Sequence, residues 1–453
     1  MIRKRKFALS TTQIILLSFL VTILVGSALL ALPISSASGK GVRYLDALFT
    51  ATTSTCVTGL VTLPTVSTWS VFGQIVILLL IQVGGLGIIT IMSGLMLLLN
   101  RKMGISDRLL IQDSFNLNTM SGLAKFIKNV LLGTLIIEGI GALAYMFVFI
   151  PDFGAKGIWI SVFNSVSAFC NAGIDIIAEN SLCNYATNPL INIVTSALIV
   201  LGGLGYIVWW DVIRVVKSRS RKDRKIFRRL TLHSKIAITV TLGLIFIGAV
   251  LLFIFEYANP LTIGGMSLFD KIQVSFFQSV TTRTAGFASV PQENLTNASA
   301  AVSIILMLIG GSPVGTAGGI KTVTIAILIC SALATIRNKN SATLFGRRVS
   351  EESIKKAVAV AVTFLSICTM STVLLMATSN ASALDAVYET VSATATVGLS
   401  RNLTATLNAF GKLIIIITMY LGRVGPISLA VALGSKSKNQ NVISEPTEDI
   451  SIG

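Results

Sequence analysis

Long apolar segments recur along the chain, and shorter stretches rich in threonine, serine and glycine separate them. A helix needs about 20 apolar residues to cross a hydrocarbon core. Segments of that length cover residues 12–33, 71–99, 129–150, 189–213, 236–257, 357–378 and 408–435, and a further stretch, 299–335, is too long for one plain crossing. The pattern predicts an all-α, multi-pass membrane protein with eight transmembrane helices.

The first apolar run follows the basic residues Arg3, Lys4, Arg5 and Lys6. A cleavable signal peptide has the same order of charge and apolarity, but this run is too long and no small-residue cleavage site follows it cleanly. We therefore expect residues 12–33 to form the first spanning helix.

A motif between the apolar runs occurs four times, with an aromatic residue ten positions before a glycine. The copies run from Phe49 to Gly59, Phe163 to Gly173, Phe276 to Gly286 and Tyr388 to Gly398. The residues leading into each glycine predict short helices, too brief to span, over 46–54, 159–168, 270–281 and 385–393. Irregular backbone inside a membrane is tolerated only where it is buried in protein or lines water. Four matching loops therefore predict four walls around one pore.

Each copy lies between an outer and an inner apolar helix, so the chain divides into four repeats of helix, pore loop and helix. We expect these repeats in a pseudo-fourfold arrangement, with four re-entrant pore helices, at residues 1–100, 101–220, 221–340 and 341–453. Asp46, Asp270 and Asp385 lie at or near the starts of predicted pore helices, where a carboxylate suits the helix dipole. We interpret these aspartates as helix caps and not as ion ligands.

The four loops carry the candidate potassium-binding residues. They contain no ring of acidic side chains, and rings of backbone carbonyls replace the hydration shell of the ion in potassium filters. Glycine permits the positive φ that keeps carbonyls pointed inward. One glycine in each of four dissimilar loops predicts a real but imperfect preference for potassium over sodium. The predicted filter comprises Cys56, Val57, Thr58, Gly59, Cys170, Asn171, Ala172, Gly173, Arg283, Thr284, Ala285, Gly286, Ala395, Thr396, Val397 and Gly398.

Arg283 is the one charged residue in these loops. A guanidinium on the axis of a cation path would repel the ion. We expect its side chain to point backwards and brace the loop, so that only its carbonyl faces the ion.

A glycine-rich stretch interrupts the inner helix of the third repeat. Five glycines and a proline fall within ten residues, and no α-helix survives that composition. A loose kink is the plain alternative. We favour an intramembrane loop that crosses the pore beneath the filter and moves for ions to pass, although Pro313 would stiffen it. The predicted gate comprises Gly310, Gly311, Ser312, Pro313, Val314, Gly315, Thr316, Ala317, Gly318 and Gly319.

Arg423 stands in the fourth repeat where Gly85, Gly203 and Gly311 stand in the others. A charge within an inner helix is costly and indicates a function. Facing the axis, the guanidinium would raise the barrier to potassium and bond to carbonyls of residues 310–319, so Arg423 belongs to the predicted gate.

Two Gly-Gly-x-Gly motifs, at 84–87 and 202–205, lie within apolar runs and not after a strand. A nucleotide site is therefore not expected there. Small residues in these positions allow helix backbones to pack closely.

Composition and charge agree with the membrane assignment. Hydrophobic residues make up 53% of the chain and charged residues 12%, while the net charge is +17. Of the 36 lysines and arginines, 27 lie in five clusters at 3–6, 101–128, 214–235, 337–356 and 436–438. The positive-inside bias puts both termini and the three loops between repeats in the cytoplasm. The basic loops suit anionic lipid headgroups or an acidic cytosolic partner, and no nucleic-acid partner is expected.

No residue pattern in the chain indicates an enzyme. Five cysteines lack metal-ligand spacing, and their odd number argues against a disulfide framework. His233 has no acidic or nucleophilic partner nearby in the sequence, so we interpret it as structural. The alternatives to a pore are a structural membrane scaffold, which four re-entrant motifs disfavour, and an alternating-access secondary transporter driven by sodium or protons. Such a transporter would use an ionisable residue near the midplane, for which Glu138 and Asp175 are the candidates.

The chain closely resembles the Trk/Ktr/HKT superfamily of potassium transporters, and within it the bacterial Ktr-type membrane subunit. The resemblance covers nearly the whole length and rests on specific motifs: Phe49 to Gly59, Phe169 to Gly173, Thr282 to Phe287, Gly310 to Gly319 and Gly422 to Pro426.

This resemblance implies a pseudo-fourfold monomer that forms a homodimer in the plasma membrane. It implies potassium uptake, often aided by sodium, and a cytosolic octameric-type ring that binds nucleotides and opens the gate. This chain contains no nucleotide-binding domain, so ATP or ADP would bind the ring. The family's gating role carries over to residues 310–319 and Arg423, and its filter glycines to Gly59, Gly173, Gly286 and Gly398.

Overall fold

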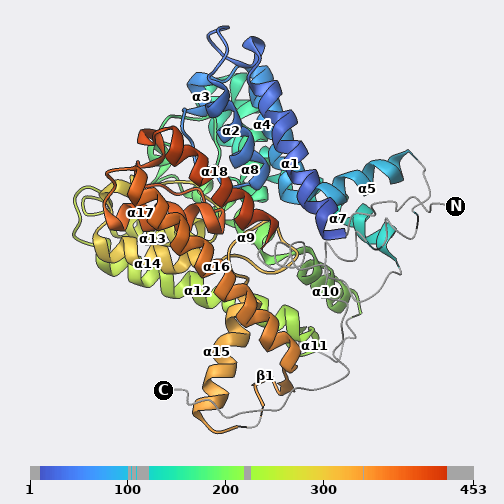
Figure 1. The fold of residues 1–453 in the computed structure, drawn as a ribbon. Coiled ribbons are helices and arrows are strands. Elements are labelled where there is room, and N and C mark those ends of the chain that lie inside the picture. Colours follow the sequence, from blue (N-terminus) through green and yellow to red (C-terminus); the bar gives the residue numbers. More distant parts are fainter. Residues whose placement is uncertain are drawn as a thin grey trace, which may run out of the picture.

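The computed structural model describes residues 11–99, 104, 109, 122–218, 226–339 and 341–425, and within these the protein is mostly helical. Four described helices are long and apolar enough to cross a membrane (Figure 1): α1 (Thr11–Leu30), α7 (Leu123–Phe153), α12 (Leu232–Glu256) and α16 (Glu351–Thr378). The described part of the chain reaches six crossings if two bent helix pairs are included. These pairs are α4 (Val71–Leu86) with α5 (Ile88–Leu98) and α9 (Pro189–Leu204) with α10 (Tyr206–Lys217).

Two bends interrupt the predicted apolar runs 71–99 and 189–213. The paired helices meet at 95° and 94°. Gly87 and Gly205 occupy the junctions with φ of 86° and 87°, a conformation that an α-helix cannot contain and that favours glycine. Gly425, with φ of 92°, ends α18 (Ala409–Val424) in the same conformation. The last glycine of each Gly-Gly-x-Gly motif is therefore a helix breaker.

Four short helices follow the four long ones, as the sequence predicts. They are α2 (Tyr44–Cys56), α8 (Lys156–Cys170), α13 (Leu268–Thr281) and α17 (Ala383–Ala395). Each packs against the long helix before it, and α2, α8 and α17 also pack against the helices that follow them, α4, α9 and α18. The remaining helices and strands are α3 (Thr65–Thr68), α11 (Ile226–Arg229), α14 (Asn297–Leu308), α15 (Thr322–Ile336), β1 (Thr343–Leu344) and β2 (Arg347–Arg348), with 3-10 turns at Pro33–Ser35, Cys183–Tyr185, Gln292–Asn294 and Thr404–Thr406.

The β1–β2 hairpin departs from the all-α prediction. Thr343 pairs with Arg348 and Leu344 with Arg347 in an antiparallel register. Phe345 and Gly346 form its turn, both with positive φ. So short an element lacks the alternating run by which strands are predicted from sequence.

The predicted aspartate caps play different parts in the structure. Ser267 and Ser382 are the N-caps of α13 and α17, and each accepts a hydrogen bond from the backbone N–H of the aspartate three residues on. Those aspartates, Asp270 and Asp385, accept a bond from the serine hydroxyl in return, so each orients the N-cap serine of its helix. Asp46 instead pairs with Lys412 at 2.5 Å.

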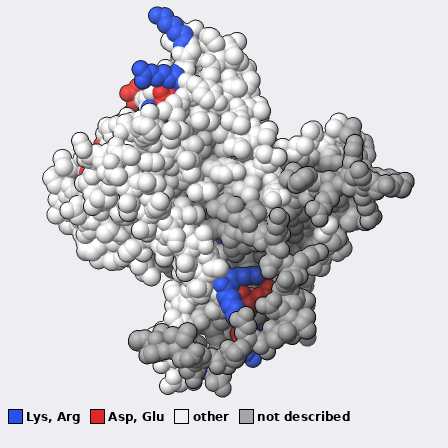
Figure 2. Space-filling model, in the orientation of Figure 1, with Lys and Arg blue, Asp and Glu red and all other residues white. Residues whose placement is uncertain are grey.

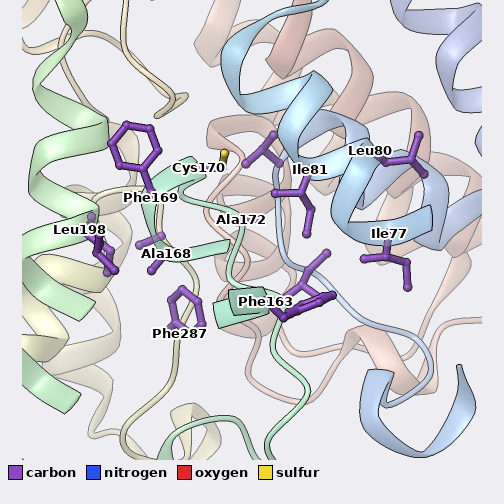
Figure 3. Packing of buried hydrophobic residues seen from close by; sticks show 14 of the residues in the cluster. Ile77, Leu80, Ile81, Phe163, Ala168, Phe169, Cys170, Ala172, Leu198 and Phe287 are labelled. Carbon is purple, nitrogen blue, oxygen red and sulfur yellow. The ribbon is translucent and has the colours of Figure 1, made fainter. Parts of the chain in front are cut away.

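A continuous core surrounds the short helix α8 (Figure 3). Phe163, Ala168 and Phe169 of α8 lie between Ile77 and Ile81 of α4 on one side and Leu198 of α9 on the other, with Phe287 close by. The motif aromatics Phe49, Phe163 and Tyr388 are fully buried, but Phe276 is exposed and its neighbour Phe277 is buried instead. The aromatic position therefore has a different role in α13.

Four contacts join the four segments that carry the glycine loops. Three of them join consecutive segments, and the fourth joins the last segment to the first. Trp159 Nε1 donates to Gln74 Oε1 at 2.8 Å, the Leu182 N–H donates to the Ala288 carbonyl at 3.0 Å, and Tyr388 Oη donates to Gln292 Oε1 at 3.0 Å. The Lys412–Asp46 ion pair completes the set. The four segments thus close on themselves around a shared centre.

The outer surface suits lipid. Phe147, Phe246 and Phe410 are among many large apolar side chains exposed on the long helices and α18. Figure 2 shows one face on which charged side chains gather toward the upper and lower ends, with few on the broad area between. A multi-pass membrane protein needs this distribution, because exposed apolar atoms are stable in hydrocarbon. The basic clusters at 3–6 and 436–438 lie outside the described residues.

Candidate functional site

The four loop glycines meet at the centre of the protein. Gly59, Gly173, Gly286 and Gly398 all have positive φ, between 63° and 97°. A Cβ added to any of them would collide with the backbone of the next loop. A Cβ on Gly59 would meet the carbonyl of Ala172, one on Gly173 that of Ala285, and one on Gly286 that of Val397. A Cβ on Gly398 would meet the carbonyl of Thr58, so the fourth loop contacts the first. Each glycine therefore lies against the peptide carbonyl that precedes the next glycine, in a closed ring.

A second left-handed residue occurs two positions before each glycine. Val57, Asn171, Thr284 and Thr396 have φ of 56°, 60°, 64° and 53°. This conformation is uncommon for any residue with a Cβ and strained for β-branched ones. Sequence reasoning assigned positive φ to the glycines alone, because valine and threonine rarely adopt it; Asn171 is the one residue of the four whose type is enriched in this conformation. Each loop therefore contains two left-handed residues separated by one position.

Hydroxyl groups of the short helices form hydrogen bonds with the backbone of the glycine loops that follow them. Thr53 Oγ1 and Ser392 Oγ each accept the backbone N–H of their own loop glycine, Gly59 or Gly398, at 3.0 Å. Ser167 Oγ bonds both the N–H and the carbonyl of Ile174, the residue after Gly173. Thr281 Oγ1 donates to the carbonyl of Phe287, the residue after Gly286, at 2.7 Å. These hydroxyls are functional residues that the sequence analysis did not single out, although all four loops are preceded by serine and threonine.

A cavity of about 320 Å³ lies on one side of the glycine ring, and all four glycines line it. Asp175, Glu179 and Glu293 also line it, whereas no lysine or arginine is among its lining residues in the described part of the chain. Asp175 borders this cavity with little of its surface exposed. It is nine-tenths buried and accepts the Ile177 N–H at 3.4 Å, and this burial raises the pKa of its carboxyl to about 6.

Residues 310–319 form an irregular loop on the opposite side of the ring, between α14 and α15. The Ser312 and Thr316 N–H groups donate to the Gly203 and Gly202 carbonyls at 2.8 Å and 3.2 Å. The carbonyl of Val314, which has φ of 62°, accepts the Tyr206 N–H at 3.0 Å. The loop is therefore docked on the bend between α9 and α10.

The same loop contacts three of the four glycine loops. Thr316 Oγ1 donates to the Phe169 carbonyl at 3.1 Å and lies 3.2 Å from Asn171 Oδ1. The Gly318 N–H donates to Thr284 Oγ1 at 3.2 Å. On its other side, Gly318 packs so closely on Thr396 Oγ1 and the Ala395 carbonyl that a Cβ has no room.

Arg423 joins this loop to the first inner helix. One guanidinium nitrogen donates to the Thr316 carbonyl at 2.7 Å and the other to the Gly84 carbonyl at 2.5 Å. Arg423 also lines a second cavity of about 220 Å³, together with Tyr206, Val314 and residues 84–90.

Lys321 is a second cation in this region, and sequence reasoning missed it. Its Nζ donates to the Ala317 carbonyl at 2.6 Å. A charged residue directly after the glycine-rich stretch, inside an apolar segment, was the available signal. Two cations thus bond to neighbouring carbonyls of residues 310–319.

Arg283 turns away from the glycine ring, as predicted. Its guanidinium is buried and donates to the Thr241 carbonyl of α12 at 3.2 Å and to the Gly310 carbonyl at 2.9 Å. It therefore braces the third loop against the outer helix and the start of the irregular loop.

The remaining candidates lie elsewhere. Glu138 is buried in α7 and accepts Gln82 Nε2 at 3.2 Å, while Cys170 Sγ lies 3.4 Å from Gln82 Oε1. His233 Nε2 is buried at the start of α12 with no hydrogen-bond partner among the described residues. No group of three or more histidine, cysteine, aspartate or glutamate side chains in the described ranges could hold a metal ion.

Comparisons with known proteins agree with this geometry. A model of the TrkH family, described as a cation transport protein, matches residues 3–443. The chain is 38% identical over 458 residues to the potassium/sodium uptake protein NtpJ of Enterococcus hirae, covering 100% of this chain and 98% of that protein. It is 38% identical over 431 residues to the Ktr system potassium uptake protein B of Bacillus subtilis, covering 95% and 94%.

A solved structure shares the fold. The crystal structure of the potassium transporter TrkH from Vibrio parahaemolyticus matches with a TM-score of 0.75 at 16% identity, covering 95% of this chain and 86% of that chain.

Proposed function

The chain belongs to the TrkH family of cation transport proteins, and from that premise we propose that it takes up potassium through one pore across the cell membrane. The pore is formed by four helix–pore-loop–helix repeats in a pseudo-fourfold arrangement of eight transmembrane helices. The observation that carries the proposal is the closed ring of contacts between each loop glycine and the carbonyl before the next one.

Peptide carbonyls of the ring form the selectivity filter. Irregular backbone in the middle of a membrane protein must line water or be buried, and here four such segments meet in a ring whose glycines all line one cavity. No acidic side chain belongs to the loops, so carbonyl dipoles replace the hydration shell of the ion. Potassium is the favoured cargo, and the four non-identical loops suit an imperfect selectivity over sodium.

The charge distribution indicates which cavity faces outward and which faces the cytoplasm. The cavity lined by Asp175, Glu179 and Glu293 collects cations from outside, since an acid-lined cavity raises the local cation concentration. The second cavity contains Arg423 and faces the cytoplasm. The basic cluster at 337–356, which includes Arg347 and Arg348 of the exposed hairpin, agrees with the positive-inside bias. Both termini are then cytoplasmic.

Residues 310–319 with Arg423 form the gate. The loop lies directly against the filter loops, and its bonds to Arg423 and Lys321 fix it there with two positive charges near the ion path. Ions pass when the loop moves aside.

A homodimer and a cytosolic nucleotide-binding ring complete the proposed system, with sodium as a stimulating ion. Such a ring moves the gate from the cytoplasmic side. Arg214, Arg228 and Arg347, which are exposed in the basic clusters at 214–235 and 337–356, offer it a docking surface. ATP or ADP binds the ring, and anionic lipid contacts the same basic belt.

The alternative is an alternating-access transporter coupled to sodium or protons. Glu138 motivates it, because a buried acid inside a membrane helix marks many ion pathways. Glu138 hydrogen-bonds to Gln82 and is not among the residues that line either cavity, which favours the pore. Flux far above transporter turnover, reversing at the potassium equilibrium potential, distinguishes the two.

The test is growth of a potassium-uptake-deficient strain on low potassium, with flux into proteoliposomes measured in parallel. The parent should rescue growth, and Gly286→Ser should not, because a side chain at Gly286 meets the Val397 carbonyl. Gly265→Ser is the matched control, since Gly265 has nothing within 4 Å of an added Cβ. Rescue by Gly286→Ser equal to that by the parent would refute the filter assignment.

A further inference from the structure

The residue two positions before each loop glycine faces a different environment in each loop. All four are left-handed, but their side chains are valine, asparagine and two threonines at 57, 171, 284 and 396. Thr284 is the one of the two threonines whose hydroxyl is bonded in the described structure, accepting the Gly318 N–H at 3.2 Å. The hydroxyl of Thr396 is equally buried but has no hydrogen-bond partner among the described residues.

The bond between Thr284 and Gly318 joins two buried residues. Thr284 has φ of 64° and is wholly inaccessible, so its conformation depends on contacts that hold it. Gly318 is fixed by close packing on Thr396 and the Ala395 carbonyl. Any displacement of residues 310–319 away from the ring therefore removes a contact that holds the third loop.

We propose that Thr284 is a positioning residue through which the place of the intramembrane loop sets the ion selectivity of the filter. The inference rests on the proposed function and deepens it. With the loop in place, the Gly318 N–H holds the Thr284 side chain and so the backbone leading to Gly286. When the loop moves, this hold is lost and the third loop accommodates sodium, the smaller ion, more readily.

The chain supplies matched variants for a test. Thr284→Val keeps the shape of the side chain and removes the acceptor, and Val57 shows that valine adopts this conformation at the equivalent position, with φ of 56°. Thr396→Val makes the same change in a neighbouring loop without removing a hydrogen bond. Thr363→Val is the control away from the glycine loops, since the Thr363 hydroxyl donates to the Ala359 carbonyl of its own helix, α16. Thr284→Ser keeps the hydroxyl.

The experiment measures the ratio of potassium to sodium uptake by the full chain in proteoliposomes. Thr284→Val should lower the ratio of potassium to sodium uptake, and the ratio should end about fivefold below that of Thr396→Val. This factor is expected from the loss of one buried hydrogen bond. Thr284→Ser should restore the ratio, and Thr363→Val should match the parent. Equal ratios for Thr284→Val and Thr396→Val would overturn the proposal. Thr284→Ala serves the same comparison if the valine variant does not fold, as judged by its melting temperature.

A second arm separates this proposal from the proposed gate. Arg423→Ala, which frees the loop, should raise flux and lower the ratio in the parent, but should raise flux without a further fall in the ratio in Thr284→Val. A rise in flux with an unchanged ratio in both backgrounds would refute the coupling and leave the gate standing. Absence of potassium uptake by the parent would instead refute the proposed function.

Discussion

The four glycine loops and the irregular loop at 310–319 lie against each other, yet they are held by different kinds of contact. Each glycine loop is fixed by a hydroxyl of its own short helix, six or seven residues away in the chain. Residues 310–319 are fixed by the bend at 202–205 and by Arg423, which is 107 residues from Thr316 and 339 from Gly84. Local, neutral contacts suit a part that keeps its shape. Remote contacts, of which the two made by Arg423 are charge-assisted, suit a part that detaches when distant helices move.

Removing Arg423 tests this contrast most strongly. Arg423→Ala deletes two charge-assisted hydrogen bonds, each worth about 1.5–3 kcal/mol, and removes a positive charge from the ion path. We expect potassium flux to rise by about tenfold or more, measured by rubidium tracer uptake into proteoliposomes.

Arg401→Ala is the control for that measurement. Like Arg423, Arg401 is held by hydrogen bonds from its guanidinium. Its partners are the Asp385 carboxylate and the Gln292 and Leu295 carbonyls, and it lies away from residues 310–319. Unchanged or reduced flux in Arg423→Ala would show that this arginine does not close the pore.

Removing Lys321 should have a smaller effect in the same direction. Lys321→Met deletes one bond, to the Ala317 carbonyl, and leaves Arg423 in place. We expect flux to rise roughly fivefold, in line with a single buried bond. Lys271→Met is the matched control, because Lys271 Nζ also donates to one carbonyl, that of Tyr257, at 2.8 Å. A larger effect for Lys321 than for Arg423 would make the lysine, and not the arginine, the main contact that keeps the pore closed.

The smallest expected effect concerns the cavity lined by Asp175, Glu179 and Glu293. Burial raises the pKa of Asp175 to about 6, so the carboxyl is charged at neutral pH and becomes neutral as external pH falls through this value. Uptake should then fall by about twofold between pH 7 and pH 5, since one of the negative charges that attract cations is lost.

Asp175→Asn should flatten that part of the pH profile, although Glu179 and Glu293 line the same cavity. Asp152→Asn is the control, because Asp152 accepts the Tyr185 hydroxyl and does not line the cavity. A profile for Asp175→Asn that follows the parent would assign the pH dependence to another group.

Several features of the fold were readable from residue spacing. Apolar runs of spanning length predict the long helices α1, α7, α12 and α16, and the four short helices begin within three residues of their predicted starts. The composition of residues 310–319 correctly predicts irregular backbone. These features depend on interactions within a few turns of the chain, where helix periodicity and glycine content decide the outcome.

Other features had no local signal. Phe276 occupies the motif position but is exposed, because the orientation of α13 buries Phe277 instead. Gly87 and Gly205 look like packing glycines within apolar runs, yet each ends a helix with positive φ. In each case a neighbour remote in sequence, or the packing of a whole helix, chose between local options.

The sequence by itself determined that this chain is a helical membrane protein, where its four loops lie and which glycines they contain, since hydrophobic length and missing side chains act locally. Only the tertiary structure decided that Gly398 lies against Thr58, that Arg423 bonds to Gly84 and that Thr284, and not Thr396, bonds to Gly318. Those contacts join residues up to 340 positions apart. They form because four similar segments pack around one centre, where the first and last come as close as neighbours.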